Sequence, residues 1–446
     1  MFRLATVLVL LAGLGRAGDR PVNIVVLYAD DAGFADFGFQ QGPAADMAKL
    51  TPHIDSIARA GVRFTNAYMS AAVCSPSRAG LMTGRNQCRF GHENNIPPGY
   101  MKGGMDLKHK TIADRLKALG YVTGLVGKWH LGYPPEYHPN KRGYDWFFGL
   151  LQGARSYVPL KRAAPNRVIQ ENGKPTPEGG YVTDRFGDAA VRFIGEHKAK
   201  PFYLFVSFTA PHGPLQAKAA DLAALESIPK LKRRKYAGLV KAMDDNVGKV
   251  LAALRKHGLD KNTLVVFTND NGGQTLTGAN NAPLRGRKGQ LFEGGIRVPM
   301  CMRWTGTIQP GATIDDPVIS LDFMPTFVGV AGGKTDAEWR LDGVDLGPRL
   351  RGAEAALAPR PLFWRKDGPG REIAMRLGRY KLHFADREKS PEPALYDLQT
   401  DVAEQTDIAA KHEERVASMR KALAAWEAEL ESPRWTYGKR RRNRKK

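Results

Sequence analysis

The chain has 446 residues, of which 42% are hydrophobic and 25% are charged, and its formal net charge is +22 at pH 7. This composition is typical of globular proteins and excludes a mostly disordered chain. A basic protein of this kind attracts polyanions such as sulfated polysaccharides, nucleic acids or anionic lipids without selecting among them.

The first residues have the pattern of a secretory signal peptide. Met1-Phe2-Arg3 is followed by an apolar stretch over 4–14 and then by small residues, so we expect cleavage after Ala17. This stretch is too short to span a bilayer, and no later segment is apolar for long enough, so no stable membrane anchor is expected. The mature protein is predicted to be exported to the periplasm or secreted, and an uncleaved anchor is the alternative.

Apolar segments and helical segments alternate through most of the chain. A continuous apolar run over 22–29 predicts a buried parallel strand. Further strands are expected over 122–126, 202–208 and 264–268, and helices over 51–60, 111–119, 183–197 and 230–257. The segment 133–180, rich in Pro, Gly and aromatic residues, is expected to be an irregular insertion that shapes a substrate pocket. The pattern predicts an α/β fold with a large mixed, mostly parallel sheet flanked by helices.

The pattern changes after about residue 352. Short alternating strands are expected near 361–364, 372–377, 380–384 and 394–398, followed by an amphipathic helix over 410–430. We therefore expect a smaller C-terminal antiparallel sheet with one helix. The predicted division is a signal peptide (1–17), a catalytic domain (18–355), a small C-terminal α+β domain (356–438) and a basic disordered tail (439–446).

The composition of the tail argues against a nucleic-acid-binding arm, and the small number of cysteines argues against a disulfide-rich protein. The tail holds seven cations but no aromatic residue, which favours a solvated end over a nucleic-acid arm, so no nucleic-acid partner is expected. Three cysteines, Cys74, Cys88 and Cys301, are too few for a disulfide framework. Cys88 and Cys301 could pair, but each is expected to pack singly, and Cys301 lies in an apolar stretch that predicts a buried strand.

Two of the expected strands end in short polar side chains. Asp30 and Asp31 follow the first strand, and Asp270 and Asn271 follow the strand over 264–268. Ligand sites of open α/β sheets lie at the carboxyl ends of the strands. These four residues offer only oxygen ligands of the kind that Ca²⁺ or Mg²⁺ prefers. Alone, either pair is more often a loop or a helix cap than a ligand set.

A run over 74–85 combines a cysteine, the start of a helix and a fixed cation; it reads Cys-Ser-Pro-Ser-Arg-Ala-Gly-Leu-Met-Thr-Gly-Arg. Ser75 is expected to cap the helix and Pro76 to occupy its first position. Cys74 would then lie at the positive end of the helix, about one turn from Arg78, where a developing anion is stabilised. A buried structural cysteine is the alternative.

The run over 74–85 resembles the sulfatase signature Cys-x-Pro-Ser-Arg followed by Thr-Gly, and Gly-Lys-Trp-His-Leu-Gly at 127–132 resembles a second signature of that family. The resemblance covers about 21–333. It implies a cysteine-type, formylglycine-dependent sulfatase of the arylsulfatase family, with the fold of the alkaline phosphatase superfamily. A maturation enzyme would oxidise Cys74 to formylglycine, an aldehyde that hydrates to a geminal diol.

The resemblance also implies how the predicted metal site is built. One divalent cation, expected to be Ca²⁺ with Mg²⁺ as the alternative, would be held by Asp30, Asp31, Asp270 and Asn271. The converted Cys74 would add a further oxygen.

Roles in the reaction follow from the same resemblance. Lys128 and Lys288 would bind the sulfate oxygens, and Arg78 would hold the diol in its reactive form. His130 would be the base that restores the aldehyde. His212, in Ala-Pro-His-Gly-Pro, or Lys288 would protonate the leaving alcohol.

The implied activity is hydrolysis of a sulfate monoester. One diol hydroxyl would attack sulfur, and loss of a proton from the other would release sulfate without attack of water on sulfur. The basic body favours a sulfated carbohydrate over a steroid sulfate. Two alternatives are a phosphonate or phosphate ester hydrolase of the same superfamily and an inactive, basic glycan-binding homologue.

Overall fold

A computed structural model describes residues 21–353 and 356–435 of the chain. The predicted signal peptide (1–17) and basic tail (439–446) therefore lie outside the described residues. No helix in the described ranges is both long and apolar enough to cross a membrane.

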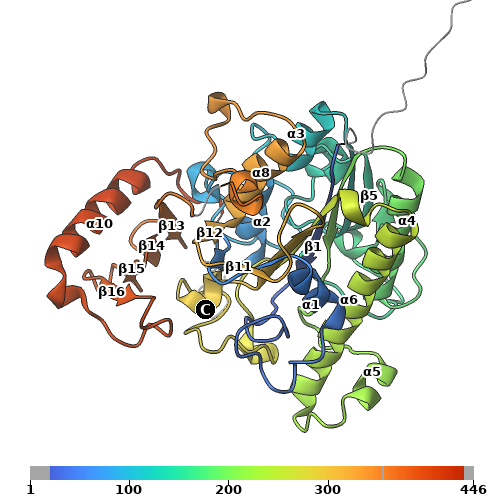
Figure 1. Cartoon of the computed structure of the whole chain (residues 1–446), viewed down its shortest axis with the longest axis horizontal. Helices are drawn as coiled ribbons and strands as arrows, with labels where there is room; N and C mark the ends of the chain where they lie inside the picture. The colour runs from blue at the N-terminus through green and yellow to red at the C-terminus, as the bar shows by residue number, and fades with distance from the viewer. Residues whose placement is uncertain (1–20, 354–355, 436–446) are drawn as a thin grey trace, which may run out of the picture.

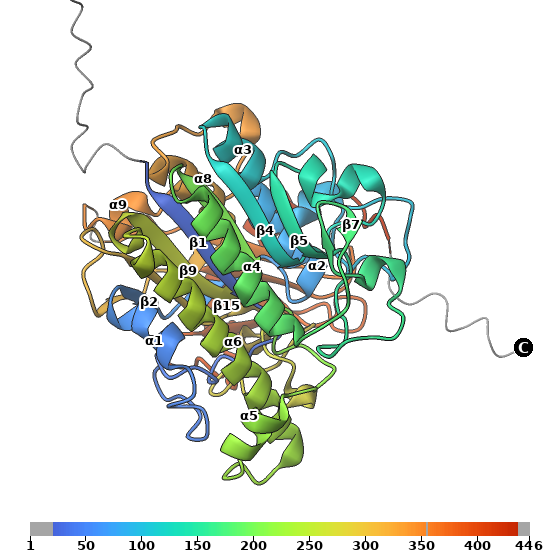
Figure 2. The same cartoon turned by 90° about the vertical axis from the view of Figure 1, so that its right-hand side faces the viewer.

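A ten-stranded sheet forms the centre of the molecule (Figure 2). Five adjacent strands pair in parallel, namely β9 (Thr263–Asn269), β1 (Asn23–Ala29), β8 (Phe202–Ser207), β4 (Val122–Lys128) and β5 (Trp146–Leu150). The sheet is completed beyond β9 by β10 (Met300–Trp304), β2 (Val62–Phe64) and β11 (Ala312–Ile314), and beyond β5 by β6 (Gln170–Glu171) and β7 (Lys174–Pro175). Because β10 and β6 run antiparallel to their inner neighbours, the sheet is mixed but mostly parallel, as predicted.

Helices cover both faces of this sheet, which is why every residue of β1, β8 and β9 is buried. One face packs against α1 (Pro52–Arg59), α4 (Val182–His197) and α6 (Leu231–Lys256). The other packs against α2 (Cys74–Thr83), α3 (Ile112–Ala118) and α8 (Phe323–Val330). Shorter elements connect these layers: α5 (Ala219–Ala224), α7 (Glu293–Ile296), α9 (Gly347–Leu350) and the two-stranded pair β3 (Ala67–Tyr68) and β12 (Val318–Ile319). All ten residues of α2 are buried.

The segment 133–180 is less irregular than predicted. It contributes β5, β6 and β7 to the main sheet. The expectation was wrong for residues 146–150, because this short aromatic run is buried beside β4 and pairs with it in parallel. Short, apolar, glycine-containing runs are ambiguous from sequence alone, and here tertiary packing decides the structure.

The C-terminal part forms the predicted small antiparallel sheet (Figure 1). Its strands are β13 (Pro361–Arg365), β14 (Ile373–Leu377), β15 (Tyr380–Phe384) and β16 (Ala394–Asp397), and α10 (Glu413–Glu427) packs on one face. Cys88 is buried in this second core and Cys301 in the main core. All three cysteines have free thiols, so the expectation that Cys88 and Cys301 pack singly is confirmed.

A buried ion cluster joins the small sheet to the main body. Lys381 of β15 lies 3.0 Å from a carboxylate oxygen of Glu293 and 2.8 Å from one of Glu404. Glu404 also accepts a 2.7 Å hydrogen bond from the backbone N–H of Glu293. Burial opposes ionisation of Glu293, but Lys381 and Arg297 outweigh it and lower the pKa of this carboxyl to about 2. Since Glu293 opens α7, the C-terminal sheet fixes the end of the loop over 283–292.

Replacing Lys381 by Met tests this junction. The change leaves two buried carboxylates without their shared ammonium, so the free energy of unfolding should fall by about 3–5 kcal/mol in a denaturant titration. Lys389→Met is the control, because Lys389 is 81% exposed and its loss should change stability by about 0.5 kcal/mol or less. Equal stability of the two variants would contradict the proposed role of the cluster.

Candidate active site

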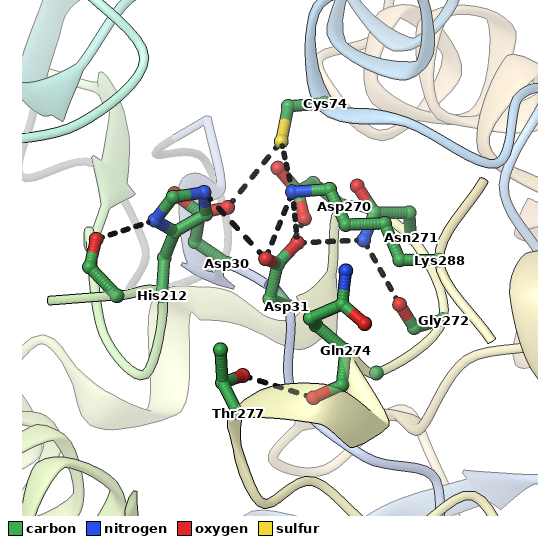
Figure 3. A network of polar contacts seen from close by, with 12 residues as sticks. Asp30, Asp31, Cys74, His212, Asp270, Asn271, Gly272, Gln274, Thr277 and Lys288 are labelled. Carbon is green, nitrogen blue, oxygen red and sulfur yellow. Dashed lines mark hydrogen bonds and ion pairs between the residues drawn. The ribbon is translucent and has the colours of Figure 1, made fainter. Parts of the chain in front are cut away.

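Four polar residues meet where two neighbouring parallel strands end (Figure 3). Ala29 of β1 pairs in register with Asn269 of β9, so the residues that follow, Asp30–Asp31 and Asp270–Asn271, emerge side by side. The Asp31 N–H donates to Asp270 Oδ1 at 3.2 Å, and Asn271 Nδ2 donates to Asp31 Oδ1 at 2.9 Å. The strand register therefore brings the two predicted acid pairs together.

Cys74 begins α2 and faces this group. Its Sγ lies 3.6 Å from Asp30 Oδ1 and 3.3 Å from Lys288 Nζ. The helix start and nearby cations favour a thiolate, but burial has the larger effect and, together with Asp270, raises the pKa of the thiol to about 12. As a cysteine, this side chain is a protonated thiol at neutral pH.

The predicted capping role of Ser75 is wrong. Val73 occupies the N-cap position of α2 and provides no side-chain cap, so Ser75 and Pro76 both lie inside the first turn. The Ser75 hydroxyl instead donates to the backbone carbonyl of His130 at 2.7 Å, and the Ser75 N–H donates to Asn95 Oδ1 at 2.8 Å. Ser75 therefore ties the start of α2 to the turn that carries His130.

Three cations are paired with three carboxylates beneath the cysteine. Lys128 Nζ lies 2.7 Å from Asp30 Oδ2, Lys288 Nζ lies 2.7 Å from Asp31 Oδ1, and Arg78 Nη2 lies 3.0 Å from Asp270 Oδ2. The carboxylates are at most 4% exposed, and the most exposed cation, Lys288, is 13% exposed.

Two members of these pairs, Asp270 and Lys288, keep their charge despite burial. Burial disfavours the charged form of Asp270, but Arg78 and Lys128 outweigh it and lower the pKa of this carboxyl. Burial likewise opposes the charge of Lys288, yet Asp31 raises the pKa of its ammonium well above the usual range. Arg78 is held further by Ser207 Oγ at 2.5 Å and by the Lys128 carbonyl at 3.2 Å. The site therefore holds fixed charges rather than mobile side chains.

Two histidines flank the cysteine. His212 Nδ1 contacts the Gly213 carbonyl at 2.7 Å, and its Nε2 lies 3.6 Å from Asp31 Oδ2. His130 has a left-handed backbone, with φ of 61°, and is held by a bond from its N–H to the Leu151 carbonyl at 3.0 Å. Burial, with Lys128 next, lowers the pKa of His130 well below its usual value, so its imidazole is neutral.

The donor set fits a hard divalent cation. Ligand atoms of Asp30, Asp31, Cys74 and His212 all lie within 4.8 Å of one another. Asn271 Oδ1 is buried and has no hydrogen-bond partner among the described residues, so this oxygen is available to a cation. Carboxylate and amide oxygens are the ligands that Ca²⁺ and Mg²⁺ take. The family resemblance implies Asp30, Asp31, Asp270, Asn271 and the converted Cys74 as metal ligands, and it implies only proton transfer for His212.

A cleft of about 150 Å³ opens above Cys74 and is lined by His130, His212 and Lys288. The cleft is also lined by Asn95, Gln152 and Arg167, which the sequence motifs did not identify individually. Arg167 Nε donates to Gln152 Oε1 at 3.0 Å. In the sequence, Gln152 and Arg167 are indicated only by their position in the segment 133–180, which is expected to shape a pocket.

Comparison with known proteins gives matches along most of the chain. The family model described as Sulfatase matches residues 22–333, and the model described as N-sulphoglucosamine sulphohydrolase, C-terminal, matches residues 287–429. The chain is 33% identical to arylsulfatase J of Mus musculus over 341 residues, which cover 74% of this chain and 56% of that relative. It is 34% identical to N-acetylgalactosamine-6-sulfatase of Canis lupus familiaris over 398 residues, which cover 84% of this chain and 74% of that protein.

A solved structure is similar over nearly the whole chain. The crystal structure of Ps i-CgsB in complex with k-i-k-neocarrahexaose superposes with a TM-score of 0.88 and 34% sequence identity. The superposition covers 94% of this chain and 96% of that one. The similarity therefore includes the C-terminal sheet as well as the large sheet.

Removal and return of a divalent cation tests the metal site. Chelator-treated protein should gain thermal stability when Ca²⁺ is added, because an ion that binds only the folded state stabilises it by about 2.7 kcal/mol at one hundred times Kd. Asp31→Asn should abolish this Ca²⁺-dependent shift in Tm. Asp188→Asn, at a carboxylate that is 67% exposed, should keep it. A shift of the same size in both variants would place the ion elsewhere.

Proposed function

The chain belongs to the sulfatase family, and from this premise we propose that it hydrolyses sulfate monoesters of a sulfated carbohydrate in the cleft above Cys74. The observation that carries the proposal is the set of three buried cations, Arg78, Lys128 and Lys288, fixed around one cysteine. Preorganised charges in a water-poor site stabilise the negative charge that develops on transferring oxygens. A relative named for N-acetylgalactosamine 6-sulfate and a similar structure that holds neocarrahexaose support a carbohydrate substrate.

Two groups complete the proposed site. A maturation enzyme would oxidise Cys74 to formylglycine, whose hydrate would supply one hydroxyl to attack sulfur with departure of the alcohol, and a second hydroxyl whose deprotonation would release sulfate. Asp30, Asp31, Asp270 and Asn271 would hold one divalent cation, Ca²⁺ by preference, which would supply positive charge next to the nucleophile. The unpartnered Asn271 oxygen and the three buried carboxylates beside it support a hard cation over zinc.

The side chains of this chain then have distinct tasks. Lys128 and Lys288 bind the sulfate oxygens, and Arg78, fixed by Asp270 and Ser207, orients the nucleophile at residue 74. His130 is neutral because of burial and its cationic neighbours, so it can accept a proton. His212 Nε2 faces the site and can donate a proton to the leaving alkoxide when the ring is protonated.

The cellular setting of this activity is also a proposal. Export with loss of residues 1–17 follows from the basic, apolar and small-residue pattern of the N-terminus. We assign residues 18–355 to the catalytic domain, 356–438 to the small domain and 439–446 to a solvated tail. The four-stranded sheet with α10 supports a separate C-terminal unit.

Replacing Cys74 by Ser tests the nucleophile. A serine has one hydroxyl instead of the two of a hydrate, so it should accept the sulfuryl group but fail to release it. The expected result with 4-nitrophenyl sulfate is a single burst of product and a sulfated protein in the mass spectrum. Cys74→Ala should give neither. Sustained multiple turnover by the serine variant would overturn the mechanism.

Mass spectrometry and substrate ratios separate the alternatives. The tryptic peptide 64–78 of active protein should carry an aldehyde in place of the thiol, whereas an unmodified thiol in matured protein would favour an inactive glycan-binding homologue. A higher kcat/KM for an aryl sulfate than for an aryl phosphate is expected. The reverse ratio would favour a phosphate or phosphonate ester hydrolase.

Gly153→Ala tests the position of His130 without changing a polar group. A Cβ at residue 153 would lie 2.5 Å from the His130 ring, so the imidazole must move. Displacement of a catalytic group by about 1 Å can cost about 10²-fold in rate, and we expect a loss of that order in kcat with an unchanged Tm. Gly179→Ala is the control, since its Cβ would meet nothing within 4 Å. A normal kcat in Gly153→Ala would contradict the proposed role of His130 as a base.

A further inference from the structure

A second, larger cleft lies at the opposite end of α2 from Cys74. It has a volume of about 720 Å³ and is bounded by the residue just beyond α2, the segment 106–109, the segment 340–342 and the chain that follows α10. None of its lining residues lines the cleft above Cys74. Because α2 has ten residues, this cleft begins about 15 Å along the helix from the nucleophile.

The acidic side chains of this larger cleft are already paired. Arg89 binds Asp342 at 2.8 Å and also contacts Glu429. Arg434 binds Asp106 at 2.5 Å and Glu431 at 3.3 Å. These acids are therefore engaged by two arginines, only one of which lines the cleft.

Three cations of the cleft have no such partner. In the described part of the chain, no ion pair is formed by Arg85, Lys108 or Arg340, all of which line it. Arg85 is half-buried, and its Nε is buried without a hydrogen-bond partner among these residues. Burial, together with the neighbouring Arg89 and Arg340, lowers the pKa of Arg85, and the opposite effects of Asp342 and Glu431 are too small to reverse this shift. An oxyanion between Arg85 and Arg340 would supply the missing acceptor and relieve their repulsion.

An aromatic surface continues the cleft. A neighbouring hollow of about 290 Å³ shares Arg85, Lys108 and Arg340 with the larger one and adds Trp339 and Lys110. Arg115 stacks over the Trp339 ring at 3.7 Å, which holds the indole in place. A ligand that has both anionic groups and a non-ionic body fits this combination better than a small inorganic anion does.

We propose that this cleft is a second binding site for sulfated saccharides, with Arg85 and Arg340 contacting a sulfate group of the bound chain. The choice of a sulfated saccharide over other polyanions rests on the proposed function, because a polymeric substrate of such an enzyme carries further sulfate groups at a distance from the one that is cleaved. The inference that an anion binds here depends only on the cleft and its unpaired cations.

The double variant Arg85→Gln/Arg340→Gln tests the site in the full-length protein. Binding of a fluorescent heparin octasaccharide is measured in a Cys74→Ala background at fixed ionic strength, so turnover does not interfere. We expect its affinity to fall about tenfold. The matched control is Arg255→Gln/Lys256→Gln at the end of α6, on the other face of the sheet, which removes the same charge and should leave binding nearly unchanged. Equal losses in the two double variants would overturn the proposal.

Two further measurements identify the ligand and show whether this proposal can hold when the proposed function fails. A labelled single-stranded oligonucleotide should bind more weakly than the octasaccharide, and tighter binding that depends on Arg85 and Arg340 would overturn the assignment to saccharides. In protein with intact Cys74, the double variant should keep kcat and KM for 4-nitrophenyl sulfate. If the parent protein cleaves no sulfate ester but still binds the octasaccharide through Arg85 and Arg340, the proposed function fails and this site remains.

Discussion

The pairing of three buried carboxylates with three buried cations is the interaction on which the site depends. Each carboxylate emerges at the end of β1 or β9, and its partner comes from a different part of the chain: Arg78 from α2, Lys128 from the end of β4 and Lys288 from the loop before α7. Removing one member would leave an uncompensated charge in a low-dielectric environment, which costs several kcal/mol. The positions of the side chains around Cys74 therefore depend on these three ion pairs as well as on the backbone.

The C-terminal sheet helps to hold Lys288 in its ion pair with Asp31, although no strand of that sheet lines the cleft above Cys74. Lys381 holds Glu293 and Glu404, and Arg285 donates a 2.7 Å hydrogen bond to the Glu404 carbonyl. The loop over 283–292 is thus anchored near both ends, and it carries Lys288 to Asp31. The C-terminal sheet therefore supports the position of one of the three cations, Lys288.

Much of the fold and of the site could be predicted from the sequence. The apolar runs that became β1, β8 and β9 were continuous and free of charged residues, so their burial and parallel pairing followed from simple patterns. The acid pairs after β1 and β9 were identified because parallel strands end at one edge of a sheet. The motifs also located Cys74 and Lys128, which the structure places beside the carboxylates.

The missed features depend on contacts between distant segments. Ser75 looked like a helix cap, but the His130 carbonyl and Asn95 compete for its hydroxyl and N–H, and neither partner is visible from local spacing. The buried strand β5 was missed because five residues with a glycine carry no periodic signal. Gln152 and Arg167 come together only through folding of the segment between β5 and α4.

The complete burial of α2 has a consequence for the order of events in the life of the protein. Cys74 is 1% exposed, and the nine residues after it are buried as well, so a catalyst the size of a protein cannot reach the thiol in the folded state. Oxidation of this side chain by another protein would have to precede closure of the sheet around the helix. A chain that folds before this oxidation would retain the Cys74 thiol. The fraction of modified protein would then depend on the rate of oxidation relative to the rate of folding.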